Sequence, residues 1–503
     1  MHEIEAILKF VFCFKWLNHG ADIRNTRSAK GELKINRFTV KNLRLRWTFF
    51  AGRDISATPA IANGVAYFPS WNGYLYAVNA FSGTLIWKQN LGELTGLTGT
   101  GIVVNVTVSR STPTIAGDCL IVGIYGPAVV IAVSRLTGKL MWSTKLDPRP
   151  RALITQSGTY YMGKEREQKS LKPKELVFNL RKCQFAAGSE LVRVPKRTGG
   201  YAGAAIWGSS PAIDEIRRLV YVATGNLYSA PPEVTECQEA QNNQTTRPTQ
   251  PDQCIGPDIN FNSILAISLD SGKIRWSRQL GGYDIFYFAC LIPNNPDCPP
   301  GPNVDADFGE APILLSVVVN RRIRDVVVAV QKSGFAWALD RNDGTIIWFK
   351  LAGPGGAEGG GQWGAATDGR TVYTNIANTN RVRFTLAPTN ETTTAGAWVA
   401  LDANSGQILW STANPSNDTA QGPVSVVNDV LFAGSVASNG PIYAMDTRTG
   451  SILWSYNTGA TVYGGISASH GCIYLGNGYT VGLAKLFHPD WTPGTSLYAF
   501  CLD

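Results

Sequence analysis

Ala338–Trp348 reads ALDRNDGTIIW, and its frame of Ala, then Gly six residues later and Trp four residues after that, occurs six times in the 503-residue chain. The other copies are Ala77–Trp87, Ala132–Trp142, Ala266–Trp276, Ala400–Trp410 and Ala444–Trp454. Each copy has an apolar strand, polar turn residues beside Gly and a second apolar strand that ends in Trp, which is the pattern of a β-hairpin. The Gly can adopt backbone angles closed to other residues, and we expect the Trp to pack against the neighbouring unit. A unit repeated in this way predicts a repeat architecture.

The spacing of the phrases predicts how many units there are. Their Trp residues are 55, 134, 72, 62 and 44 residues apart, so the 134-residue gap is expected to contain one degenerate unit at about residues 160–200. Ser496–Asp503 is a half phrase, and Leu43–Trp47 is an isolated strand; if they share a sheet, the N-terminal strand closes the ring and removes its open edge. Six complete units, one degenerate unit and one split unit predict an all-β, eight-bladed β-propeller with tryptophan docking motifs over residues 16–503.

Composition and charge exclude several classes of protein. Only 16% of the residues are charged, and the net charge of +8 is concentrated in Lys164–Arg197, so the rest of the surface is close to neutral. This distribution and the lack of a recognisable motif argue against nucleic-acid binding. The sequence contains no run of 18 apolar residues, so no membrane span is predicted.

The nine cysteines form no CxxC pair and no His-spaced zinc pattern. Cys237 and Cys254 enclose one polar, Pro-rich loop, and Cys290 and Cys298 enclose another, which predicts two disulfides. Cys472 and Cys501 fall in expected strands of the last blade, where they either pair across the closure of the ring or remain buried thiols. Loop-enclosing disulfides favour an oxidising compartment.

The localisation signals of the sequence disagree. Disulfides and four glycosylation triplets favour an extracellular or secretory-pathway protein; the acceptors are Asn105, Asn243, Asn390 and Asn417. Residues 1–15 form an N-terminal extension that is a poor signal peptide, because Glu3 and Glu5 stand where positive charge is expected. Either the protein is intracellular or this N-terminus is not the natural one.

The opening of the chain carries a family resemblance. Trp16–Asp22 (WLNHGAD), Asn25–Arg27 and Leu43–Trp47 resemble the start of the quinoprotein alcohol dehydrogenases, eight-bladed propellers that bind pyrroloquinoline quinone (PQQ). The repeated phrase is similar to that family's tryptophan docking motif. The chain looks most like the polyvinyl alcohol dehydrogenase-like branch, including its plant members, from about Trp16 to Asp503. This resemblance implies PQQ-dependent oxidation of an alcohol, with electrons passed to a separate acceptor.

Three residues resemble the family's cofactor-binding positions. Arg110 stands where the family places an arginine against the quinone carboxylates, and a guanidinium can hold such an anion through two hydrogen bonds. Trp207 lies outside the docking phrases and resembles the tryptophan beneath the planar cofactor. Lys332 resembles the basic residue at the quinone's reactive carbonyl edge, where a fixed positive charge stabilises the reduced cofactor. From the residues alone, Arg110 could equally form a salt bridge at a strand end.

The resemblance also implies a calcium ion and a catalytic base. Asn226, in a Gly-Asn-x-x-x-x-Pro stretch, matches the asparagine that binds calcium, and Glu190 is a candidate remnant of the calcium-binding glutamate. Asp258 fits the place of the aspartate that takes the alcohol's proton, with a shift of one residue. Asp307 is expected to have a mainly structural role. A turn-forming asparagine and a solvated loop aspartate are the alternatives for Asn226 and Asp258.

Departures from the family pattern keep two interpretations open. The chain has no pair of adjacent cysteines to cap the quinone and no CxxCH haem attachment, and Lys164–Arg197 is basic and has no docking phrase. One interpretation is a PQQ- and calcium-dependent dehydrogenase. The other is a catalytically inactive propeller that serves as a binding or assembly scaffold.

Overall fold

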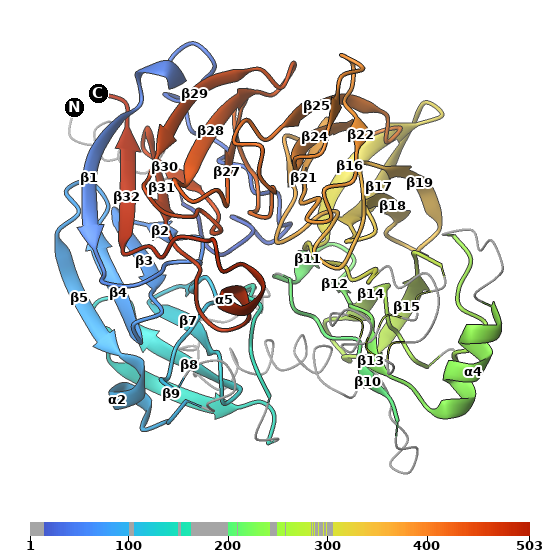
Figure 1. Ribbon diagram of the computed structural model, residues 1–503. Helices are drawn as coiled ribbons and strands as arrows, with labels where there is room; N and C mark the ends of the chain where they lie inside the picture. The colour runs from blue at the N-terminus through green and yellow to red at the C-terminus, as the bar shows by residue number, and fades with distance from the viewer. Residues whose placement is uncertain are drawn as a thin grey trace. The chain divides into compact units, whose positions relative to one another are not determined.

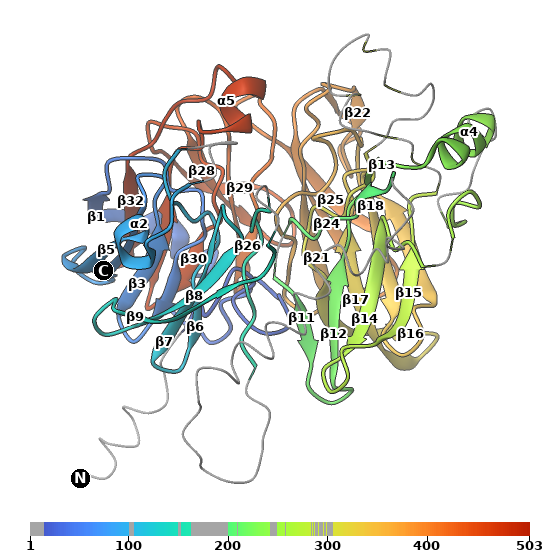
Figure 2. The ribbon, with the colours of Figure 1, turned by 90° about the horizontal axis from the view of Figure 1, so that it is seen from below.

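The computed structural model describes residues 15–99, 105–148, 152–161, 200–208, 210–241, 249–256, 258–282, 284, 286, 290, 295, 298 and 305–503. The chain divides into two compact units. Unit 1 comprises Met1–Asp22, Thr26–Gly158 and Gly422–Asp503, and unit 2 comprises Ile23–Asn25 and Thr159–Gln421. Both units are built from four-stranded antiparallel sheets (Figures 1 and 2).

Unit 1 contains four of these sheets. The first is β2 (Ala60–Ala62), β3 (Val65–Pro69), β4 (Tyr74–Asn79) and β5 (Leu85–Asn90), and the second is β6 (Thr114–Ala116), β7 (Cys119–Ile124), β8 (Val129–Ser134) and β9 (Leu140–Lys145). The third is β26 (Ser425–Val427), β27 (Val430–Gly434), β28 (Pro441–Asp446) and β29 (Ile452–Asn457). The fourth is β30 (Ser467–Ser469), β31 (Cys472–Gly476), β32 (Ser496–Cys501) and β1 (Arg44–Phe50). The short helices are η1 (Val40–Asn42), α2 (Leu91–Thr95) and α5 (Leu483–Phe487).

Unit 2 contains three four-stranded sheets. They are β11 (Ala212–Asp214), β12 (Leu219–Ala223), β14 (Ser263–Ser268) and β15 (Ile274–Gln279); β16 (Ile313–Val319), β17 (Arg322–Val330), β18 (Phe335–Asp340) and β19 (Ile346–Leu351); and β20 (Ala366–Thr367), β21 (Thr371–Ile376), β24 (Ala397–Asp402) and β25 (Ile408–Ala413). Two strand pairs lie in its loops, β10 (Ala202–Gly203) with β13 (Leu227–Ser229) and β22 (Phe384–Thr385) with β23 (Thr392–Thr393). Helix α4 (Pro232–Gln241) follows β13.

The all-β, propeller-type prediction is confirmed, but the number of blades is wrong. The described residues form seven four-stranded sheets, not eight. Part of the long gap between Trp142 and Trp276 lies inside a single sheet, because β12 and β14 are joined by residues 224–262, which contain β13 and α4. The stretch assigned to a degenerate blade, about 160–200, lies almost wholly outside the described residues. The predicted number of blades was wrong because it was derived from the length of this gap, so loop residues were counted as strand residues.

The repeated phrase is the hairpin of the third and fourth strands of a sheet. In all six copies the Ala is fully buried and lies opposite the Trp, as in the pairs Ala77–Trp87 and Ala338–Trp348. The phrase Gly has a positive φ in every copy, for example 74° at Gly344, which only glycine adopts without strain. The hairpins predicted from the sequence are confirmed.

The Trp side chains dock on the following sheet within each unit. Trp87 Nε1 donates to the carbonyl of Arg135, and Trp276 Nε1 donates to that of Arg341, three residues after the phrase Ala in both cases. A Cβ on Gly344 would come within 2.7 Å of the Trp276 ring, so the absent side chain makes room for the indole. This contact repeats in both units, which confirms the predicted packing role of the phrase Trp.

The N-terminal strand completes the last sheet of unit 1. Strand β1 pairs antiparallel with β32, as predicted, and the two strands are neighbours in Figure 1. Cys472 in β31 and Cys501 in β32 are partners in register and form a disulfide, so the pairing alternative is the correct one. The predicted disulfides Cys237–Cys254 and Cys290–Cys298 are also present.

Replacing Cys472 and Cys501 with alanine is expected to lower the free energy of unfolding by about 3–4 kcal/mol, because the unfolded chain regains the entropy of a closed 29-residue loop. Guanidinium unfolding of the double variant checks this value. The matched control is the C290A/C298A variant, which opens a loop of only 8 residues and should lose about 1 kcal/mol less. A loss below about 1 kcal/mol for the first variant would contradict the prediction.

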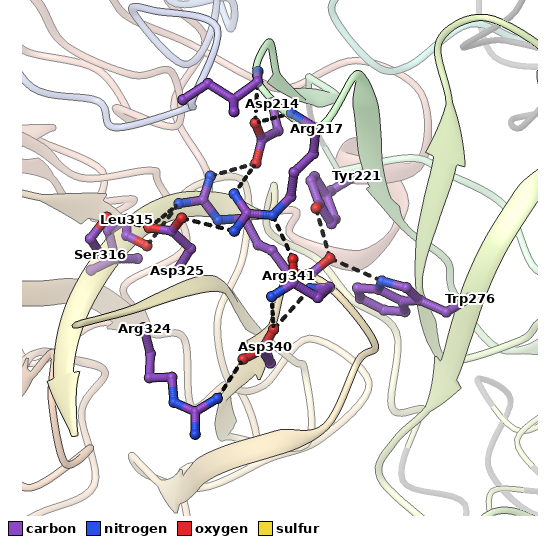
Figure 3. A network of polar contacts seen from close by, with 12 residues as sticks. Asp214, Arg217, Tyr221, Trp276, Leu315, Ser316, Arg324, Asp325, Asp340 and Arg341 are labelled. Carbon is purple, nitrogen blue, oxygen red and sulfur yellow. Dashed lines mark hydrogen bonds and ion pairs between the residues drawn. The ribbon is translucent and has the colours of Figure 1, made fainter. Parts of the chain in front are cut away.

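A network of ion pairs ties two sheets of unit 2 together (Figure 3). Asp214 Oδ2, in the β11–β12 hairpin, contacts Arg217 Nη1 at 3.0 Å and Arg341 Nη1 at 2.8 Å. Asp325, in β17, contacts the same two arginines at 2.9 and 3.0 Å. Burial by itself would raise the pKa of Asp325, but the Ser316 hydroxyl and the two guanidinium groups outweigh it and lower that pKa. The network is a structural joint between the sheets.

The order of strands places one class of loop at one end of each sheet. In an antiparallel meander, the segment entering the first strand and the loop from the second to the third strand lie at the same end. In unit 2 these are residues 200–211, 224–262, 280–312 and 331–334, and Figure 2 shows β13 and α4 at the end of their sheet away from the β11–β12 hairpin. The Asp214 network lies at the opposite end. Three of the predicted site residues therefore meet at one end: Trp207, Asn226 and Lys332.

Candidate functional site

The centre of the candidate site in unit 2 is a buried lysine between two aspartates. Lys332 Nζ lies 2.7 Å from Asp305 Oδ2 and 2.8 Å from Asp307 Oδ2. The side chains of the two aspartates are 5% and 4% exposed, and that of the lysine is 10% exposed. The peptide N–H of Lys332 also donates to the carbonyl of Asp307, so backbone and side chain fix the same pair. Burial disfavours the charged form of each of these groups, so the attraction between the ammonium and the two carboxylates is needed to keep them charged.

Burial and charge act in opposite directions within this cluster. Burial alone would lower the pKa of Lys332, but the two carboxylates raise it well above its ordinary value, so the ammonium stays charged. Burial raises the pKa of Asp305 well above its ordinary range, and the opposing attraction of Lys332 is too small to cancel this. Asp305 is therefore a carboxyl group that can take up a proton next to a permanent positive charge.

Trp207 lies against this charged cluster. The ammonium of Lys332 is 5.1 Å from the centroid of the Trp207 ring, within the range of a cation–π contact. Trp363 meets Trp207 edge-on, with ring centroids 5.0 Å apart. The Gly309 backbone also packs near the indole, and a Cβ there would come within 3.3 Å of it. The indole is only half-buried, so it offers a flat apolar surface beside a fixed charge.

Asn226 joins the same cluster through its backbone. Its peptide N–H donates to Asp307 Oδ1 at 2.6 Å, and its Nδ2 donates to the carbonyl of Phe286 at 2.9 Å. A Cβ on Gly225 would lie 1.9 Å from Asp307 Oδ1, so only glycine allows this approach. The Oδ1 atom of Asn226 is buried and accepts no hydrogen bond from the described residues. A buried acceptor left in this way is the kind of atom that a bound cation or ligand would engage.

Neither Asp258 nor Glu190 is part of the described cluster. Asp258 is exposed, in the loop between β12 and β14. Glu190 falls outside the described residues. Asp305, which the sequence interpretation did not single out, takes a central position, two residues before Asp307, and both carboxylates contact Lys332. Asp307 has the structural contacts expected of it.

Arg110 belongs to unit 1, where aromatic side chains surround it. Its Nη1 donates to the hydroxyl of Tyr479 at 3.2 Å, and its guanidinium carbon is 5.2 Å from that ring. Tyr463 stacks on Tyr479 with centroids 4.4 Å apart. Burial would lower the pKa of Arg110, but its interactions with Tyr479, Tyr463 and Tyr125 raise it. The charge is thus kept in a pocket of neutral hydroxyls, a setting that suits an anion.

Two kinds of feature are absent from the described residues. No group of three or more His, Cys, Asp or Glu side chains in this part of the chain could hold a metal ion. No helix there is long and apolar enough to cross a membrane.

Comparison with known proteins identifies the class. A solved structure of quinohemoprotein alcohol dehydrogenase from Comamonas testosteroni aligns with a TM-score of 0.69, covering 97% of this chain and 80% of that one, and at 18% identity it shows the shared fold. The polyvinylalcohol dehydrogenases of a Pseudomonas species and of Sphingopyxis sp. (strain 113P3) are each 26% identical over 92% of this chain and 73% of their own length. The molecule is a propeller of the quinoprotein type.

The family follows from a model match over most of the chain. The family model described as outer membrane protein assembly factor BamB matches residues 34–278 and 304–490, and the chain belongs to this family. Within it, the relationship to the PQQ-dependent alcohol dehydrogenases is confirmed by the relatives. The plant-type part of the prediction gains no support from these bacterial relatives.

Proposed function

We propose that this protein is an alcohol dehydrogenase that uses PQQ and passes electrons to a separate acceptor. The observation that carries the proposal is the Asp305–Lys332 pair. One carboxylate oxygen of Asp305 binds the ammonium, and the other, Oδ1, is buried without a partner among the described residues. Oxidation of an alcohol needs a carboxylate that takes the hydroxyl proton. Asp305 Oδ1 is available to accept this proton, and it lies beside the fixed positive charge of Lys332.

The residues of the site fit the cofactor. Trp207 supplies a flat face, and Lys332 supplies a positive charge beside it. The role of Arg110, in unit 1, as a partner of the cofactor's carboxylates stays a prediction. When bound, the quinone would take up the hydride that the alcohol carbon gives up. The task of the chain is to orient the alcohol, accept its proton at Asp305 and keep the charge of Lys332 in place.

A calcium ion fits only in part. Asn226 Oδ1 and Asp305 Oδ1 are both buried acceptors without partners, and calcium takes several oxygen ligands of this kind. The other predicted ligand, Glu190, lies outside the described residues. We therefore propose Asn226 as a calcium ligand. Titration with PQQ in the presence and absence of calcium tests whether the ion binds.

The choice of base differs from the sequence prediction. Asp258 remains a prediction, but its exposed side chain would leave its proton in bulk water. Asp305 is buried and next to the cation, which keeps a base close to the reacting group and away from solvent. We propose Asp305 as the base and retain Asp307 as the residue that holds Asn226 and Lys332 together.

An extracellular or secretory location is part of the proposal. The three disulfides support it, since such bonds persist in oxidising compartments. The glycosylation acceptors Asn105, Asn390 and Asn417 are exposed, which supports modification, and Asn243 lies outside the described residues. The substrate class is an alcohol, small or polymeric.

The second candidate is a scaffold without catalysis. The family to which the chain belongs is described as an assembly factor, which favours this candidate. A scaffold has no need of a buried carboxylate oxygen and a buried amide oxygen that are left without partners, because such atoms cost free energy. The dehydrogenase therefore explains more of the described site than the scaffold does.

Calorimetric titration of the purified protein with PQQ, with and without calcium, tests the function. Trp207→Ala is expected to weaken PQQ binding about 5- to 13-fold, because one stacking face contributes about 1–1.5 kcal/mol. Phe349→Ala, an exposed aromatic on β19, is the matched control and should bind as the unchanged protein does. No binding by a folded protein under either condition would overturn the proposal and favour the scaffold.

A further inference from the structure

Asp284 is a buried carboxylate that the proposed function does not use. It lies in the loop between β15 and β16, and the residue is 2% exposed. Its Oδ2 accepts from the peptide N–H of Ala306 at 2.7 Å and from Asn262 Nδ2 at 2.8 Å. Its Oδ1 accepts from the peptide N–H of Phe286 at 3.2 Å and of Asp305 at 3.3 Å. Four donors on one carboxylate are a strong local restraint.

Two of these donors are the peptide N–H groups of Asp305, whose side chain contacts Lys332, and of the next residue, Ala306. The peptide groups of Asp305 and Ala306 are successive, so Asp284 holds the backbone on both sides of the Asp305 side chain. Asp305 has a φ of 54°, in the left-handed region, where a non-glycine residue needs outside support. The hydrogen bonds from Asp284 provide support at the place where the backbone departs from its preferred angles.

Asn262 extends the restraint to the sheet. Its φ is 44°, its peptide N–H donates to the carbonyl of Gly225, and its carbonyl accepts from Leu280. Asp284 is therefore anchored, through Asn262, to the segment that carries Asn226. The carboxylate joins two loops whose residues make up the Lys332 cluster.

We propose that Asp284 is a positioning residue, which fixes the left-handed backbone of Asp305 so that this side chain points at Lys332. The inference rests on the proposed function for its effect on catalysis, but its structural part stands on the contacts alone. Without Asp284, the Asp305–Ala306 segment loses its two hydrogen bonds and can relax to ordinary angles. The carboxylate of Asp305 then leaves the ammonium, and Asp307 alone remains beside it.

The first test measures the chemical reactivity of Lys332 in the protein without substrate. Acylation by a water-soluble ester, followed by mass spectrometry, reports how well Lys332 is shielded and charged. The Asp284→Ala and Asp284→Asn variants are expected to acylate Lys332 at least threefold faster than the unchanged protein. Lys350, exposed on β19, is the internal standard. Asn should have the smaller effect, because it keeps Oδ1 as an acceptor for Asp305.

The second test separates positioning from general destabilisation. With PQQ and an alcohol, Asp284→Asn is expected to lower kcat about tenfold or more while KM changes less than twofold. Asp252→Asn is the matched control: Asp252 is a buried aspartate of the same unit that accepts a peptide N–H from Cys254 and a side-chain bond from Gln238. It does not touch the Lys332 cluster, so the control should leave both the kcat and the acylation rate unchanged.

The outcomes distinguish the two proposals. If Lys332 is acylated at the unchanged rate in folded Asp284→Asn, the positioning inference is overturned, whatever the activity. If acylation is faster but the unchanged protein neither binds PQQ nor oxidises alcohols, the proposed function fails and the positioning contact stands. If acylation is faster and the enzyme is active but kcat is unaffected, the inference about catalysis is overturned and the dehydrogenase remains.

Discussion

Lys332→Met is expected to lower the free energy of unfolding by about 3–5 kcal/mol at neutral pH. The substitution keeps most of the side-chain volume but leaves Asp305 and Asp307 as buried carboxylates without a cation. Breaking a buried ion pair by removing one partner costs more than the pair contributes, because the remaining charge cannot be hydrated. Urea unfolding at pH 7 measures the loss. Lys350→Met, an exposed lysine in β19, is the matched control and should change stability by less than about 0.5 kcal/mol.

The pH dependence of this variant has a definite sign. Burial already raises the pKa of Asp305 with Lys332 present, and removing the ammonium raises it further. The folded variant then binds more protons than the unfolded chain between the ordinary aspartate pKa and the raised one, so its stability falls as the pH rises through that window. Compared with pH 7, the variant should recover stability at pH 5. A loss below 1 kcal/mol, or a loss that is equal at both pH values, would contradict the prediction.

Arg341→Met is expected to cost about 3–4 kcal/mol, the second large effect. The Arg341 side chain is 9% exposed and contacts Asp214 and Asp325, and Asp214 is itself buried. The remaining cation, Arg217, cannot serve both carboxylates as two guanidinium groups do. Arg218→Met is the matched control, because the Arg218–Asp270 pair is exposed and such pairs contribute about 0–1 kcal/mol. Guanidinium unfolding of both variants separates a buried network from a surface pair.

Acidification gives this prediction a second measurement. Asp325 has a lowered pKa in the folded protein, so its contribution is present above the unfolded aspartate pKa and is lost as the pH falls through the folded one. The unchanged protein should therefore lose stability below about pH 4, and Arg341→Met should lose less over the same range, because part of the interaction is already gone. Equal acid sensitivity of the two proteins would rule out the network as its source.

Hairpins could be predicted from the sequence because their information is local. The Ala, Gly and Trp of one phrase are all within eleven residues, and each meets its partner across a single turn, as Ala338 meets Trp348. The Cys472–Cys501 disulfide depends on the register between β31 and β32, which places the two cysteines opposite each other. The sequence placed both cysteines in strands but did not decide whether they pair. The number of blades depends on how many residues belong to strands and how many to loops. Neither the composition nor the repeat spacing distinguishes an additional blade from a long loop such as residues 224–262.

Strand order brings together two predicted site residues that directly follow strands. Asn226 comes shortly after β12 and Lys332 shortly after β17, so strand order alone brings them to one end of unit 2. Asp305, the proposed base, and Asp284 were not singled out from the sequence, because they lie in the long connection from β15 to β16, which has no hydrophobic period. Its path is set by hydrogen bonds to buried carboxylates and by a left-handed residue, and such contacts leave no repeating pattern in a single sequence.

The pairing of β1 with β32 also fixes when the last sheet of unit 1 can form. A ribosome makes β1 several hundred residues before β32, so at about 5–20 residues per second the two strands emerge tens of seconds apart. During that interval β1 is a newly made strand with no partner to cover its hydrogen-bonding groups. The sheet can therefore be completed only once β32 has been made, whereas each local hairpin needs only neighbouring residues.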